Sequence, residues 1–83
     1  MKKNLIEMRY GEAGTVMDIT CFKRELNDSG VYKGKKIRMM SKPPIRNNVI
    51  VSTRDSKVII SPEMASGIIV EPDVEMEFER TGE

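Results

Sequence analysis

Histidine and tryptophan are absent from this chain of 83 residues, and cysteine occurs only once, at Cys21. A serine or cysteine nucleophile usually takes histidine as its base, and none of the serines has the Ser-x-x-Lys spacing that would bring in lysine instead. The segment Gly11-Glu12-Ala13-Gly14 lacks both the lysine of a phosphate-binding loop and the glycine spacing of a dinucleotide-binding loop. We therefore expect neither an enzyme nor a protein with a cofactor.

Residues that commonly hold metals are few and poorly spaced for that role. Five carboxylates recur at every second residue, which places them along one face of a strand rather than around a point; they are Glu71, Asp73, Glu75, Glu77 and Glu79. Cys21 follows Met17 and Ile19 in the same alternation, so we predict that its thiol is buried. No metal site is expected from this pattern.

Long apolar runs are also missing, and this bears on the compartment. The longest, such as residues 49–51 and 58–60, have three residues, whereas a membrane span needs about 20. Glu7 follows Met1-Lys2-Lys3 too closely for the apolar region of a signal peptide, and a single cysteine cannot form an internal disulfide. We predict a cytoplasmic protein that does not itself insert into a membrane.

Charge is nearly balanced overall but uneven along the chain. The formal net charge is +1, yet residues 1–70 hold thirteen Lys or Arg against seven acids, and residues 71–83 hold six acids against Arg80. A basic body of this kind is typical of a solvated surface, and it also suits an anionic partner. At 83 residues there is room for one small domain with a thin, largely aliphatic core.

Alternating β-branched residues dominate what is present. Residues 13–22, 35–42, 48–53, 57–61 and 68–70 are each predicted to be strands, and Arg54-Asp55-Ser56 is predicted to be a hairpin turn. Residues 23–29, ended by Gly30, are predicted to form a short helix, and residues 62–66 one further helical turn. The fold class is mainly β: a small, closed or nearly closed β-barrel with one or two short helices. The predicted core comprises Val16, Ile19, Leu26, Ile37, Met39, Val49, Val51, Val58, Ile60, Ile68 and Val70.

The order of these glycines and aliphatic residues resembles the FeoA family over about Leu5 to Val70. The matching segments are Gly11-Glu12-Ala13-Gly14-Thr15-Val16-Met17-Asp18-Ile19, Arg24-x-Leu26-x-x-x-Gly30-Val31-x-x-Gly34-x-x-Ile37, Pro43-Pro44, Val49-x-Val51, Val58-Ile59-Ile60, Ala65 and Ile68-x-Val70. The resemblance implies that residues 1–71 form an SH3-like β-barrel. It also implies an accessory role in ferrous iron uptake, docked on FeoB, a membrane GTPase transporter. Ser29 and Lys33 depart from the family pattern, which usually has an apolar residue and a proline there.

Two functions remain open at this point. The first is an interaction module that binds and modulates the cytosolic part of a FeoB-type transporter, which would hold it at the inner face of the membrane. The second is a KOW-like barrel associated with RNA or the ribosome, because Gly11-x-x-Gly14-x-Val16-x-x-Ile19 fits that pattern too. The aromatic residues are not clustered on one predicted strand face as stacked bases would require, so nucleic acid is the less favoured partner.

Basic residues beside prolines mark the segment where we expect a partner to bind. The predicted partner-binding residues are Tyr32, Lys33, Lys35, Lys36, Lys42, Pro43, Pro44 and Arg46. Residues 72–83 form an acidic C-terminal extension in which Val74, Met76 and Phe78 alternate with glutamates. This alternation predicts an added strand, which would pair with the barrel's own edge or with a second copy in a homodimer.

Overall fold

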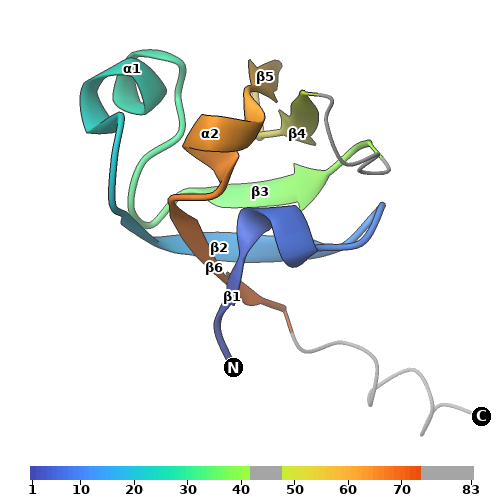
Figure 1. Cartoon of the computed structure of the whole chain (residues 1–83). Coiled ribbons are helices and arrows are strands. Elements are labelled where there is room, and N and C mark those ends of the chain that lie inside the picture. Colours follow the sequence, from blue (N-terminus) through green and yellow to red (C-terminus); the bar gives the residue numbers. More distant parts are fainter. Residues whose placement is uncertain (42–47, 74–83) are drawn as a thin grey trace, which may run out of the picture.

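The computed structural model describes residues 1–41 and 48–73, and its main feature is one antiparallel sheet (Figure 1). The strands follow the order β1-β6-β2-β3-β4-β5 across the sheet. Their bounds are β1 Lys3–Asn4, β2 Ala13–Ile19, β3 Lys36–Met39, β4 Val49–Ser52, β5 Lys57–Ile60 and β6 Ile68–Pro72. The helices are the 3-10 turn η1 Leu5–Glu7, α1 Lys23–Asp28 and α2 Pro62–Ala65. The mainly β class with two short α-helices is therefore confirmed.

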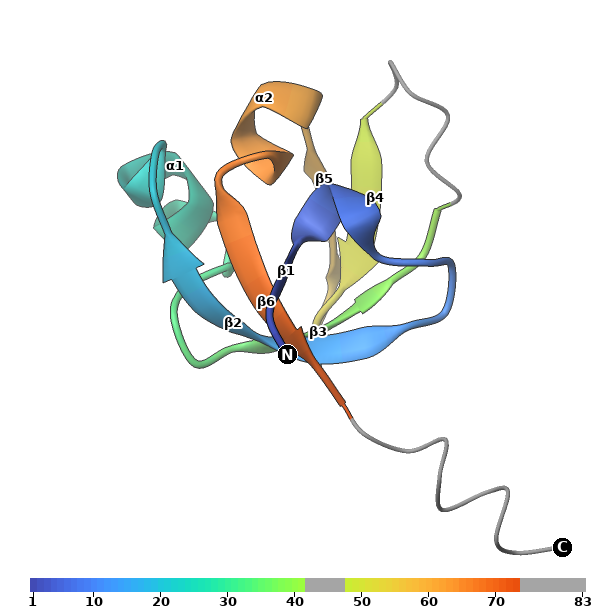
Figure 2. The same cartoon turned by 60° about the horizontal axis from the view of Figure 1, so that its bottom comes forward.

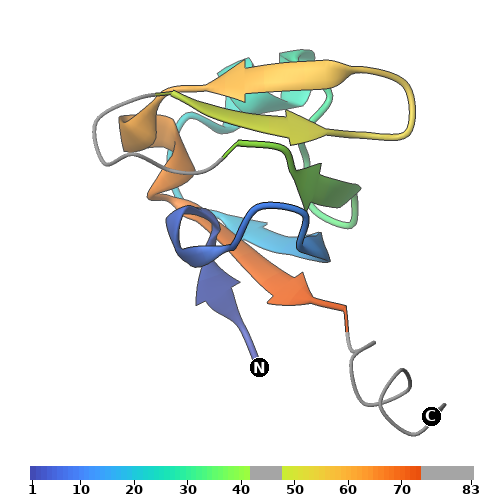
Figure 3. The ribbon, with the colours of Figure 1, turned by 90° about the vertical axis from the view of Figure 1, so that its right-hand side faces the viewer.

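Strand β2 is central to the sheet because it pairs with β3 on one side and with β6 on the other. Val16 lies opposite Val70 and Gly14 opposite Pro72, so an early and a late segment of the chain come together at this strand. Gly14 is needed for this approach, since a Cβ at that position would lie 2.7 Å from the Glu71 carbonyl oxygen. The hairpin β4–β5 extends the sheet on the far side of β3 (Figure 3).

A β-bulge at Met17 changes which residues of β2 face the core. The register shifts between Val16 and Asp18, so one extra residue is fitted into β2 opposite β6. Val16 and Ile19 are consequently both buried, while Met17 is only half-buried and Cys21 is exposed. The prediction of a buried Cys21 thiol was wrong, because β2 ends at Ile19 and the chain turns from there into α1, so the alternation does not continue to Cys21.

The core lies inside the curve of the sheet, under the helices (Figure 2). Every residue of the predicted core is buried, which follows from the alternation along each strand and from the single apolar side of α1. Among the described residues, five further apolar ones are buried that the predicted core did not include: Leu5, Met8, Ala13, Val31 and Ala65.

The N-terminal segment contributes to the fold in a way that was not predicted. Asn4 caps η1 through its side chain, and the Glu7 carboxylate accepts the Asn4 N–H at 3.0 Å in return. The Asn4 side-chain amide also donates to the carbonyl of Ser66 after α2. These contacts place Leu5 and Met8 in the core and cover one end of the sheet.

The ladder of paired strands is open rather than fully closed. Strands β1 and β5 are the two edges of the sheet, and no pairing joins them within residues 1–41 and 48–73. The sequence predicted a closed or nearly closed barrel, and the described strands leave the pairing open between β1 and β5. The turn η1 and helix α2 contact one another. Residues 74–83, on which the added strand was predicted, lie outside the described residues, as does the loop 42–47.

Candidate functional site

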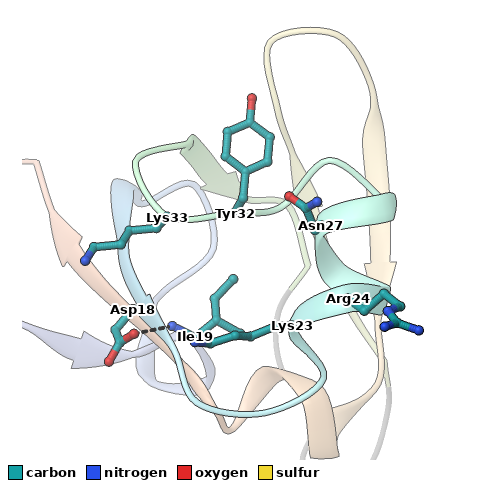
Figure 4. A pocket seen from close by; sticks show the side chains of 7 residues that line it. All are labelled: Asp18, Ile19, Lys23, Arg24, Asn27, Tyr32 and Lys33. Carbon is teal, nitrogen blue, oxygen red and sulfur yellow. Dashed lines mark hydrogen bonds between the residues drawn. The ribbon is translucent and has the colours of Figure 1, made fainter.

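An open hollow of about 510 Å³ lies beside α1, at the end of β2 (Figure 4). We call it the α1 hollow. The end of β2, helix α1 and the loop that follows α1 all contribute to it, and the side chain of Ile19 points toward its middle. The lining residues are Asp18, Ile19, Lys23, Arg24, Asn27, Tyr32 and Lys33.

Helix α1 is held in place by one buried residue and by its ending. Leu26 is the only buried residue of the helix, at 1% exposure. Gly30 takes a φ of 98°, which lets its N–H donate to Asn27 and the Val31 N–H donate to the Leu26 carbonyl at 2.8 Å. Leu26 and Val31 are both buried, so the polar residues of α1 are turned outward and toward the hollow.

The start of α1 is also constrained. Phe22, the residue before the helix, has a φ of 56°, a left-handed conformation that is unfavourable for a bulky residue. Its carbonyl nevertheless accepts the Leu26 N–H at 3.0 Å and so begins the helix. The Phe22 ring is 43% exposed, which leaves an aromatic side chain on the surface at the junction between β2 and α1.

A tight turn after α1 presents Tyr32 and Lys33. The Lys35 N–H donates to the Tyr32 carbonyl at 3.0 Å, and Gly34 supplies the positive φ of 94° that this turn needs. The turn is fastened to β2, because the Gly34 N–H donates to the Val16 carbonyl at 2.8 Å. The Lys35 ammonium lies 5.5 Å from the centre of the Tyr32 ring, a cation–π contact that favours one position of that ring.

Positive charge predominates around the α1 hollow. Three cations line it, Lys23, Arg24 and Lys33, against the single carboxylate of Asp18. One Asp18 oxygen accepts the backbone N–H of Ile19 at 2.9 Å. Among the described residues, the salt bridges engage other cations, namely the N-terminus, Lys3 and Lys36. The hollow therefore combines a basic rim with an apolar centre.

A second hollow, of about 310 Å³, lies on the outer side of β3 and is also basic. Lys36, Arg38 and Arg54 line it, and the Lys36 ammonium lies 2.9 Å from the carboxylate of Asp73. The Arg38 guanidinium donates to the Gly11 carbonyl at 2.6 Å. Cations on this side of the sheet thus belong to a different surface from those around α1.

The predicted partner-binding residues divide between these places. Tyr32 and Lys33 line the α1 hollow, and Lys35 packs beside it on the Tyr32 ring. Lys36 belongs to the second hollow, because consecutive residues of a strand point to opposite faces. The other predicted residues, Lys42, Pro43, Pro44 and Arg46, lie outside the described residues.

Several residues of the α1 hollow were missed by the sequence analysis. Lys23, Arg24 and Asn27 come from one side of α1, and Asp18 and Ile19 come from the end of β2. The helical spacing of Lys23 and Asn27 was a usable signal, since residues four apart share a helix face. The position of Ile19 in the lining of the hollow could not be predicted from the sequence, because its alternation predicts only a core residue.

No group of three or more metal-ligating side chains lies together anywhere in the part of the chain that the structure describes. Within the same residues, no helix has the length and apolar composition needed to cross a membrane.

Comparison with known proteins agrees with the arrangement of the strands. The model of the FeoA domain family matches residues 3–72. A solved structure described as iron uptake regulatory protein (FeoA) has a TM-score of 0.80 and 25% identity, covering 88% of this chain and 99% of that one. No functionally curated protein matches the chain.

Other solved structures share the fold at lower identity. The FeoA of Stenotrophomonas maltophilia in complex with zinc, described as a prokaryotic SH3 domain protein, has a TM-score of 0.70 and 20% identity, covering 83% of this chain and 89% of that one. A manganese-dependent transcriptional repressor has a TM-score of 0.79 and 20% identity, and the match covers 87% of this chain but 42% of the repressor. The sheet is thus SH3-like, as expected. With its family model matched over residues 3–72, the chain belongs to the FeoA family, which is associated with ferrous iron transport.

Proposed function

We propose that this protein is a small cytoplasmic accessory factor of ferrous iron uptake that docks on the cytosolic part of a FeoB-type transporter and modulates it. Membership of the FeoA family supports the iron-uptake role. The α1 hollow supports docking, and it is the observation on which the proposal rests. The protein stands at the inner face of the membrane through this partner and does not insert into the bilayer.

The chemistry of the hollow indicates what the transporter must present. The exposed Tyr32 side chain offers apolar contact beside the largely buried Ile19, while Lys23, Arg24 and Lys33 surround them with positive charge. A complementary surface carries an apolar side chain flanked by carboxylates. Aromatic residues such as Tyr32 contribute strongly to interfaces because they bury large area at a small cost in side-chain entropy.

Charge on the rim is expected to act mainly on the rate of association. Opposite charges raise the rate of encounter, and salt screens them over about 8 Å at physiological ionic strength. Tyr32 should act on the rate of dissociation instead, because its contact forms only after docking. The two contributions can therefore be separated by kinetics.

The test is the binding of the full chain to the purified cytosolic domain of the FeoB-type transporter from the same genome. The variant K23E/K33E should associate more slowly, and its rate should depend less steeply on salt. Tyr32→Ala should dissociate faster with little change in association. The variant K2E/R9E, at two exposed residues outside the α1 hollow, is the matched double charge-reversal control.

Two results would refute this assignment. If K23E/K33E and the K2E/R9E control have the same association rate as the natural chain, charge on the α1 hollow does not guide docking. If the natural chain does not bind the transporter domain at all, the docking role itself is wrong.

The KOW-like alternative receives no support from the family match or from the solved structures. The positions of the exposed rings also disfavour stacking on a nucleic-acid strand. Tyr10 precedes β2 and Phe22 follows it, so these two rings lie at opposite ends of a seven-residue strand.

A further inference from the structure

The outer face of strands β3, β4 and β5 carries two parallel rows of side chains. Arg38 lies opposite Ser52, and Ser52 lies opposite Lys57, which makes one polar and basic row. The Met40 N–H donates to the Ile50 carbonyl, and Ile50 lies opposite Ile59, which makes an adjacent apolar row of Met40, Ile50 and Ile59. We call this surface the two-row face.

One residue of the apolar row, Ile59, is unusually exposed for its size, while Met40 and Ile50 are half-buried. Ile59 is 67% exposed, while its neighbours in β5, Val58 and Ile60, are buried. Strand β5 is also an edge of the sheet, which natural proteins usually protect. An exposed isoleucine on an edge strand beside Lys57 and Arg38 therefore marks a surface that another segment would stabilise by covering it.

The chain itself arrives at this face where the described residues end. The Asp73 N–H donates to the Ala13 carbonyl at 2.9 Å, and the Asp73 carboxylate lies 2.9 Å from the Lys36 ammonium. Asp73 lines the second hollow together with Arg38, Ser52 and Arg54. The residues that follow Asp73 therefore start beside the basic row.

The next six residues have the composition and the length that the two-row face requires. Residues 74–79 read Val-Glu-Met-Glu-Phe-Glu, so an extended chain would carry three apolar groups on one side and three carboxylates on the other. Four steps between neighbouring strands separate β6 from β5, about 19 Å at 4.8 Å per step. Six extended residues span about 20 Å.

We propose that residues 74–79 lie across the two-row face, with their glutamates toward Arg38, Arg54 and Lys57 and their apolar side chains over Met40, Ile50 and Ile59. The occupant of this face is thus the acidic C-terminal segment of the same molecule. Its role is to cover the exposed edge isoleucine and to neutralise cations that would otherwise attract unrelated anions. This inference does not depend on the proposed docking at the α1 hollow.

The α1 hollow is the less suitable place for the same segment, although it is also basic. It lies beside Asp18 and Ile19, at the far end of β2 from Ala13, where the segment begins. Ala13 and Ile19 are six residue steps apart along β2, about 20 Å of strand, and residues 74–79 would use their whole length to arrive there. On the two-row face, by contrast, the segment can contact the basic row from its first residue, Val74.

A spin label placed just beyond the segment tests this directly in the full chain. The variant C21S/R80C carries a single cysteine for a nitroxide, and it leaves Glu75, Glu77 and Glu79 unchanged. Enhanced relaxation of backbone amides is expected to be strongest in β5 and at residue 50, and to fall several-fold at high salt. The variant E75Q/E77Q/E79Q on the same background should lose most of the enhancement.

Matched variants and a mixed sample distinguish the alternatives. Arg38→Glu with Lys57→Glu should abolish the localised enhancement, whereas Lys23→Glu in the α1 hollow should leave it unchanged. Enhancement centred on α1, or none above the level of a freely moving label, would overturn the proposal. In a further sample, chain that carries the nitroxide but no isotope label is mixed with isotope-labelled chain that carries no nitroxide. Relaxation enhancement in that sample would overturn the proposal, because it would show that the segment covers the two-row face of a second copy.

Discussion

Replacing Leu26 by alanine is the sharpest test of how the α1 hollow is held together. Leu26 is the only buried side chain of α1, and its carbonyl accepts the Val31 N–H that closes the helix. The rest of this six-residue helix is polar and exposed, and isolated helices of such length are not stable in water. The position of α1 therefore depends on one side chain.

The size of the effect follows from burial. Leucine-to-alanine changes at fully buried sites cost about 3–5 kcal/mol through lost transfer energy and the cavity that remains. Leu26 is 1% exposed, which puts it in this class. A domain of this size has a core worth about 3–5 kcal/mol in net stability. Because each kcal/mol lowers Tm by about 4–8 °C in a small domain, Leu26→Ala should lower it by more than about 10 °C.

Denaturant and thermal unfolding followed by circular dichroism measure this change. Leu26→Met conserves volume and should cost less than about 1.5 kcal/mol, and Glu25→Ala, on the exposed side of the helix, should cost less than about 0.5 kcal/mol. A Leu26→Ala variant within about 0.5 kcal/mol of the natural chain would refute the reasoning, because it would show that Leu26 does not anchor α1.

Three further predictions concern positions where the backbone or packing leaves little choice. Gly30→Ala should destabilise the fold by about 1–2 kcal/mol in denaturant unfolding, because φ is 98° at the end of α1; an unchanged midpoint would contradict the left-handed ending. Gly67→Ala should lower the free energy of unfolding by about 1–3 kcal/mol, since the added Cβ would lie 2.6 Å from the Cys21 sulfur and 2.8 Å from the Thr20 hydroxyl oxygen. The double variant with Cys21→Ala should recover part of that stability. The Cys21 thiol should react with an aromatic disulfide reagent in the folded protein at a rate close to that after unfolding, and strong protection would restore the idea of a buried thiol.

Much of the fold followed from short-range patterns. The strands around Ile37, Val51 and Val58 were predictable because side chains alternate between the two faces, and one face of each strand is buried. The end of α1 was predictable as well, since Gly30 is the residue type that adopts a positive φ at low cost. Tyr32 and Lys33 were among the predicted partner-binding residues, and they lie in the turn that directly follows the end of α1.

Other parts of the site could not be predicted from neighbours in sequence. Lys33 and Lys36 are three residues apart and were placed in one binding segment, yet they line different hollows. The turn at Gly34 leaves Lys33 beside α1, whereas Lys36 begins β3 and points away from the buried face of that strand. Only the arrangement of α1 and β3 in space shows that these two positions belong to separate hollows.

By itself the sequence determined the mainly β class, the core of each strand, the ends of α1 and the family, because each of these depends on residue type and local spacing. The tertiary structure alone decided what depends on contacts between distant segments. The bulge at Met17 arises where β2 pairs with β6, and Cys21 is exposed because β2 ends at Ile19. The burial of Leu5 requires Asn4 to reach Ser66, 62 residues away. Such long-range contacts leave no periodic signal in the chain, since neither partner carries information about the position of the other.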